Sequence, residues 1–206
     1  DKIGHAFEEA PAKKKKLLSA LLAYNRDDWG ACLKKLLALT RQATTKEEKR
    51  VAKFFTAVCL QDMGLTPAAL QVYDEILADN PSYAPALSNL SVIYFELEDY
   101  PKAITYAEQA LDYNRNNPSA YHNLASACFL TYHLEKAKNY VEKALALRPD
   151  FPEAASLLAM IEAIKGDGEA AQSSLRRAVA LGQNEEEIQG AIETMQEKYA
   201  QYAAAK

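Results

Sequence analysis

Residues 84–117 read APALSNLSVIYFELEDYPKAITYAEQALDYNRNN, and residues 118–151 read PSAYHNLASACFLTYHLEKAKNYVEKALALRPDF. The two segments have the same length, and small or apolar residues recur at the same places in both. Steps of 34 residues place alanine at four equivalent positions, which are Ala69, Ala103, Ala137 and Ala171. Other columns agree, including Thr56, Leu90, Leu124 and Leu158, followed by Ala57, Ser91, Ala125 and Ala159. Because the columns keep their phase from residue 50 to residue 185, the sequence predicts four tandem repeats.

Within each repeat the apolar spacing is that of a helix. Leu87, Leu90 and Tyr94 lie at i, i+3 and i+7, and a second stripe begins after a break at residues 98–100. This pattern predicts two amphipathic helices joined by a tight turn. Prolines, which favour the first turn of a helix, stand at the expected starts, at Pro85, Pro118 and Pro152. Each repeat is therefore predicted to be an antiparallel helix pair, whose small residues let the axes approach to about 8 Å.

The repeat length, the small residues in fixed columns and aromatic residues such as Tyr94 and Tyr121 resemble the tetratricopeptide repeat family. The resemblance implies an all-α fold, a right-handed α-solenoid superhelix of antiparallel helix pairs with 34-residue repeats. The implied units are 50–83, 84–117, 118–151 and 152–185. Two units depart from the family pattern, the first at Lys53 and Thr56 and the last at Ala155 and Glu162.

The segments outside the four units are assigned from weaker patterns. Residues 13–49 are predicted to form a divergent helical hairpin, out of register by three residues; an unrelated helix pair is the alternative. Residues 186–206 are predicted to form a capping helix, with a partner-binding helix as the alternative. One face of that helix carries Ile188, Ile192, Met195, Tyr199 and Tyr202. Residues 1–12 are interpreted as a loose leader.

Composition and charge exclude several classes of protein. The chain has 206 residues, of which 49% are hydrophobic and 25% charged, as in average globular proteins. Its net charge of -4 and its pI of about 5.5 argue against a dedicated binder of nucleic acid or anionic lipid. No apolar run reaches the ~18 residues that span a bilayer, so no direct membrane insertion is expected. The lysine run 13–16 is interpreted as a solvated helix start.

Cysteine usage and the chain start bear on the cellular compartment. Cys32, Cys59 and Cys128 are an odd and widely spaced set, which is typical of reduced core residues rather than of a disulfide framework or a zinc site. No signal peptide is recognisable, and we expect a cytoplasmic protein. The chain opens at Asp1 without a methionine, from which we infer that an upstream segment was removed. Such a segment can carry a targeting signal or a membrane anchor.

The family resemblance also implies a binding surface, because the first helix of each unit lines a concave groove. We expect the groove to hold an apolar or amphipathic segment of another protein. Asn89 and Asn123 occupy the same phase and offer carboxamides to peptide backbone groups. The alternative is that these residues pack between helices, or are covered by the N-terminal segment of the chain. The predicted groove residues are Val51, Phe54, Phe55, Val58, Ser88, Asn89, Val92, Phe95, His122, Asn123, Ser126, Phe129, Leu130, Ser156 and Met160.

The expected function is that of a non-catalytic protein-interaction scaffold. No catalytic residue, metal site or cofactor is predicted, because His5, His122 and His133 lack partners at metal-ligand spacing and no phosphate loop or nucleophile motif occurs. The groove positions also lack the paired Lys and Arg with which some family members grip a C-terminal carboxylate. The alternative function is a regulatory or self-association domain of a larger protein. A monomer is favoured, and a homodimer is kept as the second option.

Overall fold

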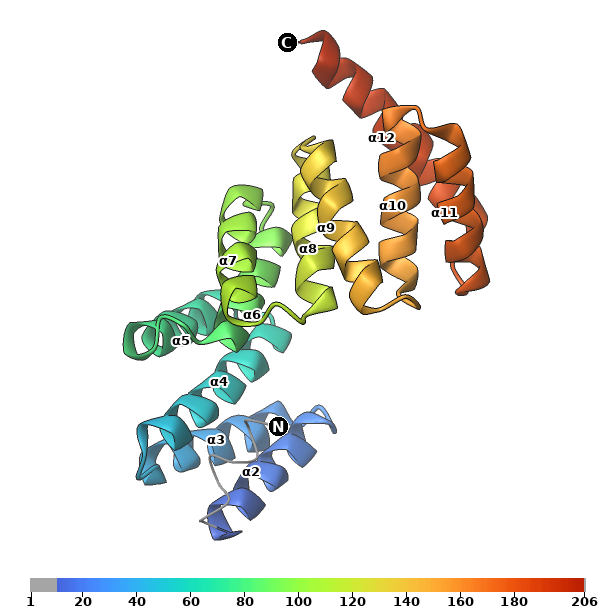
Figure 1. Cartoon of the computed structure of the whole chain (residues 1–206). Coiled ribbons are helices and arrows are strands. Elements are labelled where there is room, and N and C mark those ends of the chain that lie inside the picture. Colours follow the sequence, from blue (N-terminus) through green and yellow to red (C-terminus); the bar gives the residue numbers. More distant parts are fainter. Residues whose placement is uncertain (1–10, 206) are drawn as a thin grey trace. The chain divides into compact units, whose positions relative to one another are not determined.

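The computed structural model describes residues 11–205, and their regular secondary structure is helical throughout (Figure 1). Ten of the described helices follow one another as pairs, and the eleventh is α12, which ends the chain. The helices are α2 (Pro11–Tyr24), α3 (Trp29–Gln42), α4 (Lys46–Asp62), α5 (Thr66–Asp79), α6 (Ala84–Glu96), α7 (Tyr100–Tyr113), α8 (Pro118–Leu130), α9 (Leu134–Leu147), α10 (Pro152–Lys165), α11 (Gly168–Ala180) and α12 (Glu185–Ala204). The predicted fold class, all-α and of the α-solenoid type, is confirmed.

Two bounds differ from the sequence-based expectation. Most of the predicted leader lies outside the described residues, but residues 11 and 12 belong to α2. Helix α4 begins at Lys46, ahead of the repeat start predicted at residue 50, because Thr45 caps it. The chain divides into two compact units, unit 1 up to Leu90 and unit 2 from Ser91 onward.

Helix starts are fixed by short polar side chains that accept a backbone N–H of the first turn. The Asp28 carboxylate accepts from Ala31 N at 3.1 Å, and Asn117 Oδ1 accepts from Ala120 N at 3.1 Å. Asp99 and Asp167 do the same for the second helices of their pairs, each at 3.3 Å. These two aspartates are therefore helix caps.

The tight turn inside each pair has a left-handed residue at a fixed phase. Gly64, Glu98, Tyr132 and Gly166, spaced by 34 residues, have φ of 73°, 59°, 59° and 82°. Asp27 has φ of 56° in the turn between α2 and α3, so this hairpin uses the same kind of turn. Left-handed backbone suits glycine, whereas an L side chain there costs about 1–2 kcal/mol. The turn is thus a property of the repeat, imposed even where the residue is not glycine.

Unit 1 is held by an apolar core and by one buried ion pair. Leu36 on α3 and Val51 on α4 belong to a cluster that α2, α3 and α4 share. Lys13 Nζ donates to Glu48 Oε2 at 2.7 Å, and Thr44 N donates to the same oxygen at 2.7 Å. Burial alone would raise the pKa of Glu48, but these hydrogen bonds lower it to about 2. Lys13 is therefore a structural residue, which corrects the interpretation of residues 13–16 as a uniformly solvated run.

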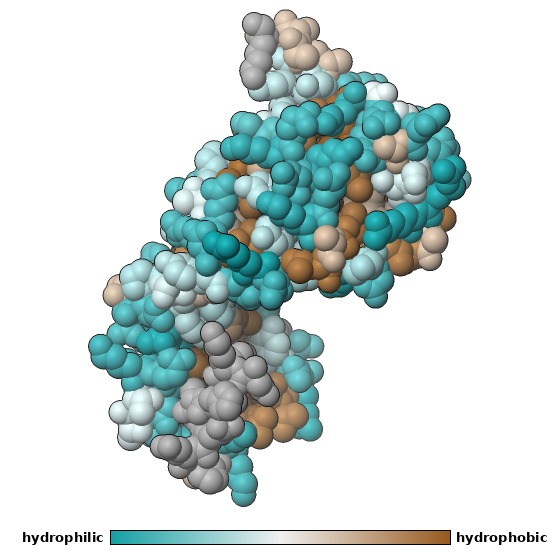
Figure 2. Space-filling view, viewed as in Figure 1, coloured by the Kyte–Doolittle hydropathy of each residue, from teal (hydrophilic) through white to brown (hydrophobic). Residues whose placement is uncertain are grey.

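Unit 2 is built on the small residues that recur through the repeats. Ala125, Ala137, Ala144 and Ala159 are fully buried where α8, α9 and α10 pack together. The face of the molecule seen in Figure 2 is mostly hydrophilic, with hydrophobic residues between the polar ones, as expected when each helix turns its apolar stripe inward.

The three cysteines are free and lie in the two cores, as predicted. Burial raises the pKa of Cys59 to about 12 and that of Cys128 to about 11. Thiols with raised pKa values are poor nucleophiles, so these cysteines contribute packing rather than reactivity.

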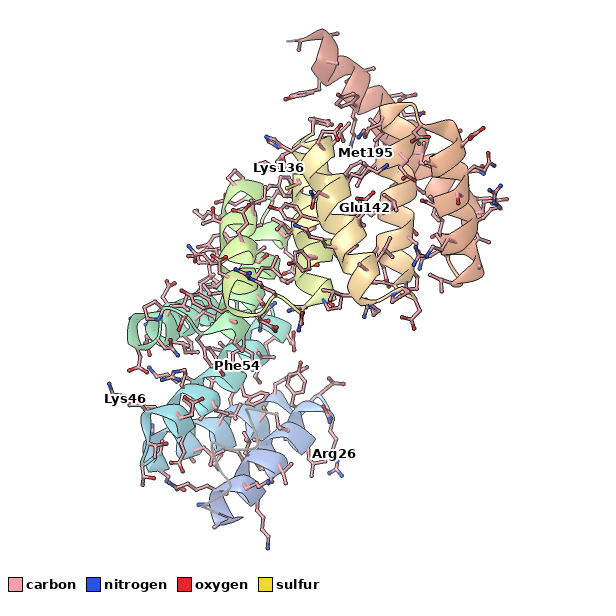
Figure 3. The ribbon with its side chains drawn as sticks, viewed as in Figure 1. Arg26, Lys46, Phe54, Lys136, Glu142 and Met195 are labelled. Atoms are coloured by element: carbon pink, nitrogen blue, oxygen red, sulfur yellow. The ribbon has the colours of Figure 1, made fainter. Side chains whose placement is uncertain are left out.

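Helix α12 does not continue the repeat arrangement. In unit 2 the first helix of a pair packs on its own second helix and, outside the pair, mainly on the second helix of the preceding pair, as α8 does on α7 and α10 on α9. Helix α12 instead packs mainly on α10 and only slightly on α11. Ile188 is buried, and Ile192, Met195 and Tyr199 pack against the core of unit 2. Met195 is labelled on this helix in Figure 3. The end of the chain therefore lies toward the first helix of the last pair, where the groove was predicted.

Candidate functional site

Four of the fifteen predicted groove residues are buried. Val51 is 1% exposed and packs against α2 and α3, while Phe54 is 9% exposed and contacts Phe55, Tyr73 and Tyr83 edge-on or tilted. Phe129 and Ser156 are equally covered in unit 2. Their burial differs from the prediction because the helix positions that face the groove and those that face the neighbouring helix are only one residue apart. These four residues belong to the core.

The other eleven predicted residues are half-buried, so part of each side chain reaches the surface. They are Phe55, Val58, Ser88, Asn89, Val92, Phe95, His122, Asn123, Ser126, Leu130 and Met160. Those up to Asn89 lie in unit 1, and those from Val92 onward lie in unit 2.

In unit 1 the carboxamide of Asn89 is committed to the protein itself. Asn89 Nδ2 donates to the hydroxyl of Tyr73 at 2.6 Å, and this hydroxyl donates to Gln61 Oε1 at 3.2 Å. Tyr73 is fully buried, and burial raises its pKa. Asn89 therefore satisfies a core tyrosine, which leaves it less able to bind a peptide than the sequence suggested.

In unit 2 the half-buried groove residues of α8 are His122, Asn123, Ser126 and Leu130. Ser126 Oγ donates to the carbonyl of His122 at 3.0 Å, so its hydroxyl is occupied within the helix. The imidazole of His122 lies 5.0 Å from the Phe151 ring, measured between ring centroids, and the Arg148 guanidinium lies 3.3 Å from that ring's centroid. Burial lowers the pKa of His122 from 6.5, so the ring is neutral at pH 7.

The equivalent positions of α10 are covered by the chain itself. Ser156 Oγ lies 3.4 Å from Gln183 Oε1, in the turn before α12, and Gln196 Nε2 donates to the carbonyl of Ala163 at 3.2 Å. Met160 lies between these two contacts on the same helix face. The segment that contacts this face of α10 is C-terminal, whereas the alternative considered from the sequence was coverage by the N-terminal segment, most of which lies outside the described residues.

Sequence reasoning missed one residue at this site, Tyr132, in the turn between α8 and α9. Its ring stacks on Tyr202 at 4.4 Å between centroids and lies 5.7 Å from Tyr199. The sequence signal was limited to the two tyrosines at i and i+3 on the predicted capping helix, and nothing in the sequence placed Tyr132 against them.

Nothing in the described part of the chain groups three or more His, Cys, Asp or Glu side chains as a metal site would require. Among residues 11–205, no helix has both the length and the apolar character needed to cross a membrane. His5 lies outside the described residues. The surface therefore offers hydrogen-bonding and apolar contacts on paired helices.

The fold and this surface define a helical-repeat scaffold for protein interactions. Family models described as tetratricopeptide repeat match residues 60–128 and residues 118–151. Residues 60–151 therefore contain tetratricopeptide repeats, as the repeat pattern predicted.

The comparison with solved structures points to the same fold. The structure titled "MamA RS-1 ArsTM double mutant" matches with a TM-score of 0.72 and 19% identity, over 82% of this chain and 93% of the other. "MamA 41-end from Desulfovibrio magneticus RS-1" matches with a TM-score of 0.70 and 20% identity, over 82% and 94%. At such identity the likeness concerns the fold.

A curated relative matches over a shorter segment. The uncharacterized protein ycf37 of Pyropia yezoensis is 39% identical over 56 residues, which are 27% of this chain and 32% of the relative. The alignment thus spans about a third of the relative's length.

Proposed function

We propose that the chain is a non-catalytic scaffold that binds an apolar or amphipathic segment of another protein along unit 2. We define the groove surface as Val92, Phe95, His122, Asn123, Ser126 and Leu130. All six are half-buried and occupy groove positions of two successive repeats. The observation that carries the proposal is that these residues of α8 stay partly exposed, whereas on α10 Ser156 and the Ala163 carbonyl contact Gln183 and Gln196 of the chain itself.

The chemistry of the groove surface suits a peptide rather than a charged ligand. The imidazole of His122 and the carboxamide of Asn123 hydrogen-bond to each other. A carboxamide has two donor hydrogens and an acceptor oxygen, so Asn123 keeps further groups for a peptide backbone. Val92, Phe95 and Leu130 supply apolar contact, and the Phe95 ring is braced edge-on by Tyr100 at 5.5 Å. None of the six residues is charged at pH 7, so recognition rests on hydrogen bonds and apolar burial.

The size of the surface limits the bound segment. From His122 to Leu130 the helix rises about 12 Å at 1.5 Å per residue. An extended peptide advances about 3.3 Å per residue, so about four residues would lie along this helix. We therefore propose that a short segment is recognised on α8, with further contacts to Val92 and Phe95 on α6.

A paired substitution on α8 tests this proposal. Asn123→Ala together with Leu130→Ser removes one hydrogen-bonding and one apolar group from the groove surface. We expect partner capture from source cells to fall about tenfold, as it does when interface anchors are truncated. The matched control is Lys136→Ser with Glu142→Ser on α9, whose side chains are exposed (Figure 3). Equal capture by both variants, with unchanged circular dichroism, would contradict the proposal.

Self-association gains no support from the face of α12. Ile188, Met195 and Tyr199, which a dimer would need to share, pack within their own unit. We propose a monomer, and sedimentation velocity over a range of concentrations tests it, because a dimer at micromolar concentration would contradict it.

We also propose a cytoplasmic location. The proposal is supported by the three free, buried thiols, which suit a reducing compartment. Fractionation of source cells tests it, and recovery of the protein in the secreted fraction would speak against it.

A further inference from the structure

The C-terminal half of α12 is little buried. Its contacts include the Gln196 hydrogen bond to Ala163, the packing of Tyr199 on the core of unit 2, and the packing of Tyr199 and Tyr202, both half-buried, on Tyr132. Most other side chains of this half are exposed. By contrast Ile188, near the start of the helix, is 5% exposed. A helix end with so little burial opens more readily than its anchored start.

Tyr132 is an unusual choice for its position. The equivalent residues of the first and last full repeats are Gly64 and Gly166, and all three have a left-handed backbone. A tyrosine is strained there, and such strain often accompanies a functional role. The structure shows what the ring does, since it stacks on Tyr202 with an interplanar angle of 27°. A glycine at this position would leave the end of α12 without its aromatic support.

Helix α12 itself shows which ligand this surface accepts. Met195, Tyr199 and Tyr202 line one face, with the tyrosines at i and i+3, while Glu193 and Glu197 are exposed. The receiving surface includes Tyr132 and the Ala163 carbonyl. Tyr132 follows Leu130 of the groove surface by two residues, so the end of α12 adjoins the place where a partner is proposed to bind.

We propose that residues 196–204 are an internal ligand of this surface, which a helix of another protein displaces. The partner helix is amphipathic, with two aromatic residues at i and i+3 on its apolar face and an acidic outer face. It would extend a segment already bound on α8 across Leu130 to Tyr132. The inference rests on the proposed function, which it refines by naming the partner's chemistry and the contact that regulates access.

The exchange can be measured with the full chain and a peptide of known sequence. The probe is a fluorescein-labelled peptide of residues 191–206, and the released variant is Tyr199→Ser with Tyr202→Ser. We expect the peptide to bind the released variant about tenfold more tightly than the unmodified chain, because its own helix no longer competes. Adding Tyr132→Ser to the released variant should abolish binding. The matched control is Tyr113→Ser, an exposed tyrosine on α7, which should bind the peptide as weakly as the unmodified chain.

Three results would overturn the proposal. One is equal peptide affinity for the released variant and the unmodified chain. Another is binding that persists without Tyr132. A third is dimerisation of the released variant that added peptide reverses. In that case the ligand that replaces the end of α12 would be a second copy of the chain.

Hydrogen exchange on the unmodified chain provides a measurement that does not depend on a variant's folding. Amides of residues 198–204 should exchange at least about tenfold faster than those of α10, and equal protection would contradict displaceability. The peptide assay reports on Tyr132, whereas capture by the Asn123→Ala and Leu130→Ser variant reports on α8. Failure of one is therefore distinguishable from failure of the other.

Discussion

Glu98 shows how the repeat imposes its geometry on a single residue. It holds φ at 59° in the column where Gly64 and Gly166 stand, and its side chain is exposed. An L residue in this conformation destabilises the folded chain by about 1–2 kcal/mol. Glycine removes this strain, but it also raises the entropy of the unfolded chain, which offsets part of the gain.

We therefore predict that Glu98→Gly raises the free energy of unfolding by about 0.5–1 kcal/mol. Chemical denaturation checks this value. Tyr132→Gly at the equivalent position is the informative comparison, because it relieves the same strain but removes the stack on Tyr202. A loss of stability in Glu98→Gly would contradict the account of the turn.

His122 should titrate below the ordinary range of histidine. Burial lowers its pKa from 6.5, with hydrogen bonding to Asn123 opposing the shift in part. A lowered folded-state pKa means that protonation favours the unfolded chain, so this contribution to stability is present above pH 6.5 and is lost as the pH falls through the folded-state pKa. We predict a midpoint below 6.5 in an NMR titration of the imidazole protons. A midpoint at or above 6.5 would show that the ring is solvated.

At the scale of single residues, the sequence predicted those roles that follow directly from the type of side chain and its place before a helix. Asp99 and Asp167 stand before helices and cap them, as expected from their type and place. The left-handed column could not be predicted, because it holds glycine in two repeats but Glu98 and Tyr132 in the others. Its conformation follows from the helix pairs on either side and not from the residue.

At the scale of helices, Glu162 links three elements. The family pattern favours a large aromatic residue there, but Glu162 on α10 is 5% exposed and accepts a hydrogen bond from Ser174 Oγ on α11 at 2.7 Å. It also pairs with Lys138 Nζ on α9 at 3.0 Å. A buried carboxylate with two partners can replace aromatic packing because its hydrogen bonds are satisfied.

We predict that Glu162→Ala lowers the free energy of unfolding by about 2 kcal/mol, since it leaves both partners unsatisfied. Denaturation of the single variants and of Glu162→Ala with Lys138→Met measures the coupling. When Lys138→Met is added to Glu162→Ala, it should lower the free energy of unfolding by less than Lys138→Met does alone. Additive losses would mean that the ion pair contributes nothing.

The helices were predictable as elements, but not in all their contacts. The apolar face of α12 follows from the spacing of Ile188, Ile192, Met195 and Tyr199. The pattern does not tell which neighbour the face meets, and a capping helix would be expected mainly against α11. The packing on α10 became evident only from Gln183 and Gln196, whose polar contacts leave no periodic trace in the sequence.

At the scale of the whole chain, the repeat period carried the prediction of the fold. Three columns of small and apolar residues are enough to predict helix pairs, because each pair can bury its faces only against the next. The binding surface was less predictable. Val51, Phe54, Phe129 and Ser156 share helices with groove residues but are buried, and burial depends on how neighbouring helices pack.

Charge is also distributed unevenly along the chain. Residues 11–42 contain eight Lys or Arg and two Asp, whereas residues 185–204 contain five Glu and one Lys. The net charge of -4 is therefore the sum of a basic segment, residues 11–42, an acidic segment, residues 185–204, and the rest of the chain. The groove surface lies between them and has no ionised side chain at pH 7, which agrees with recognition by hydrogen bonds and apolar contact.

Site-specific photo-crosslinking tests most directly whether a partner lies on α8. A photoreactive amino acid replaces Ser126, which is half-buried on the groove surface, or Glu142, which is exposed on α9 (Figure 3). Irradiation in source cells should join a partner protein to the chain modified at 126 and not to the chain modified at 142. Equal crosslinking at both positions, or crosslinking at 142 alone, would contradict the account.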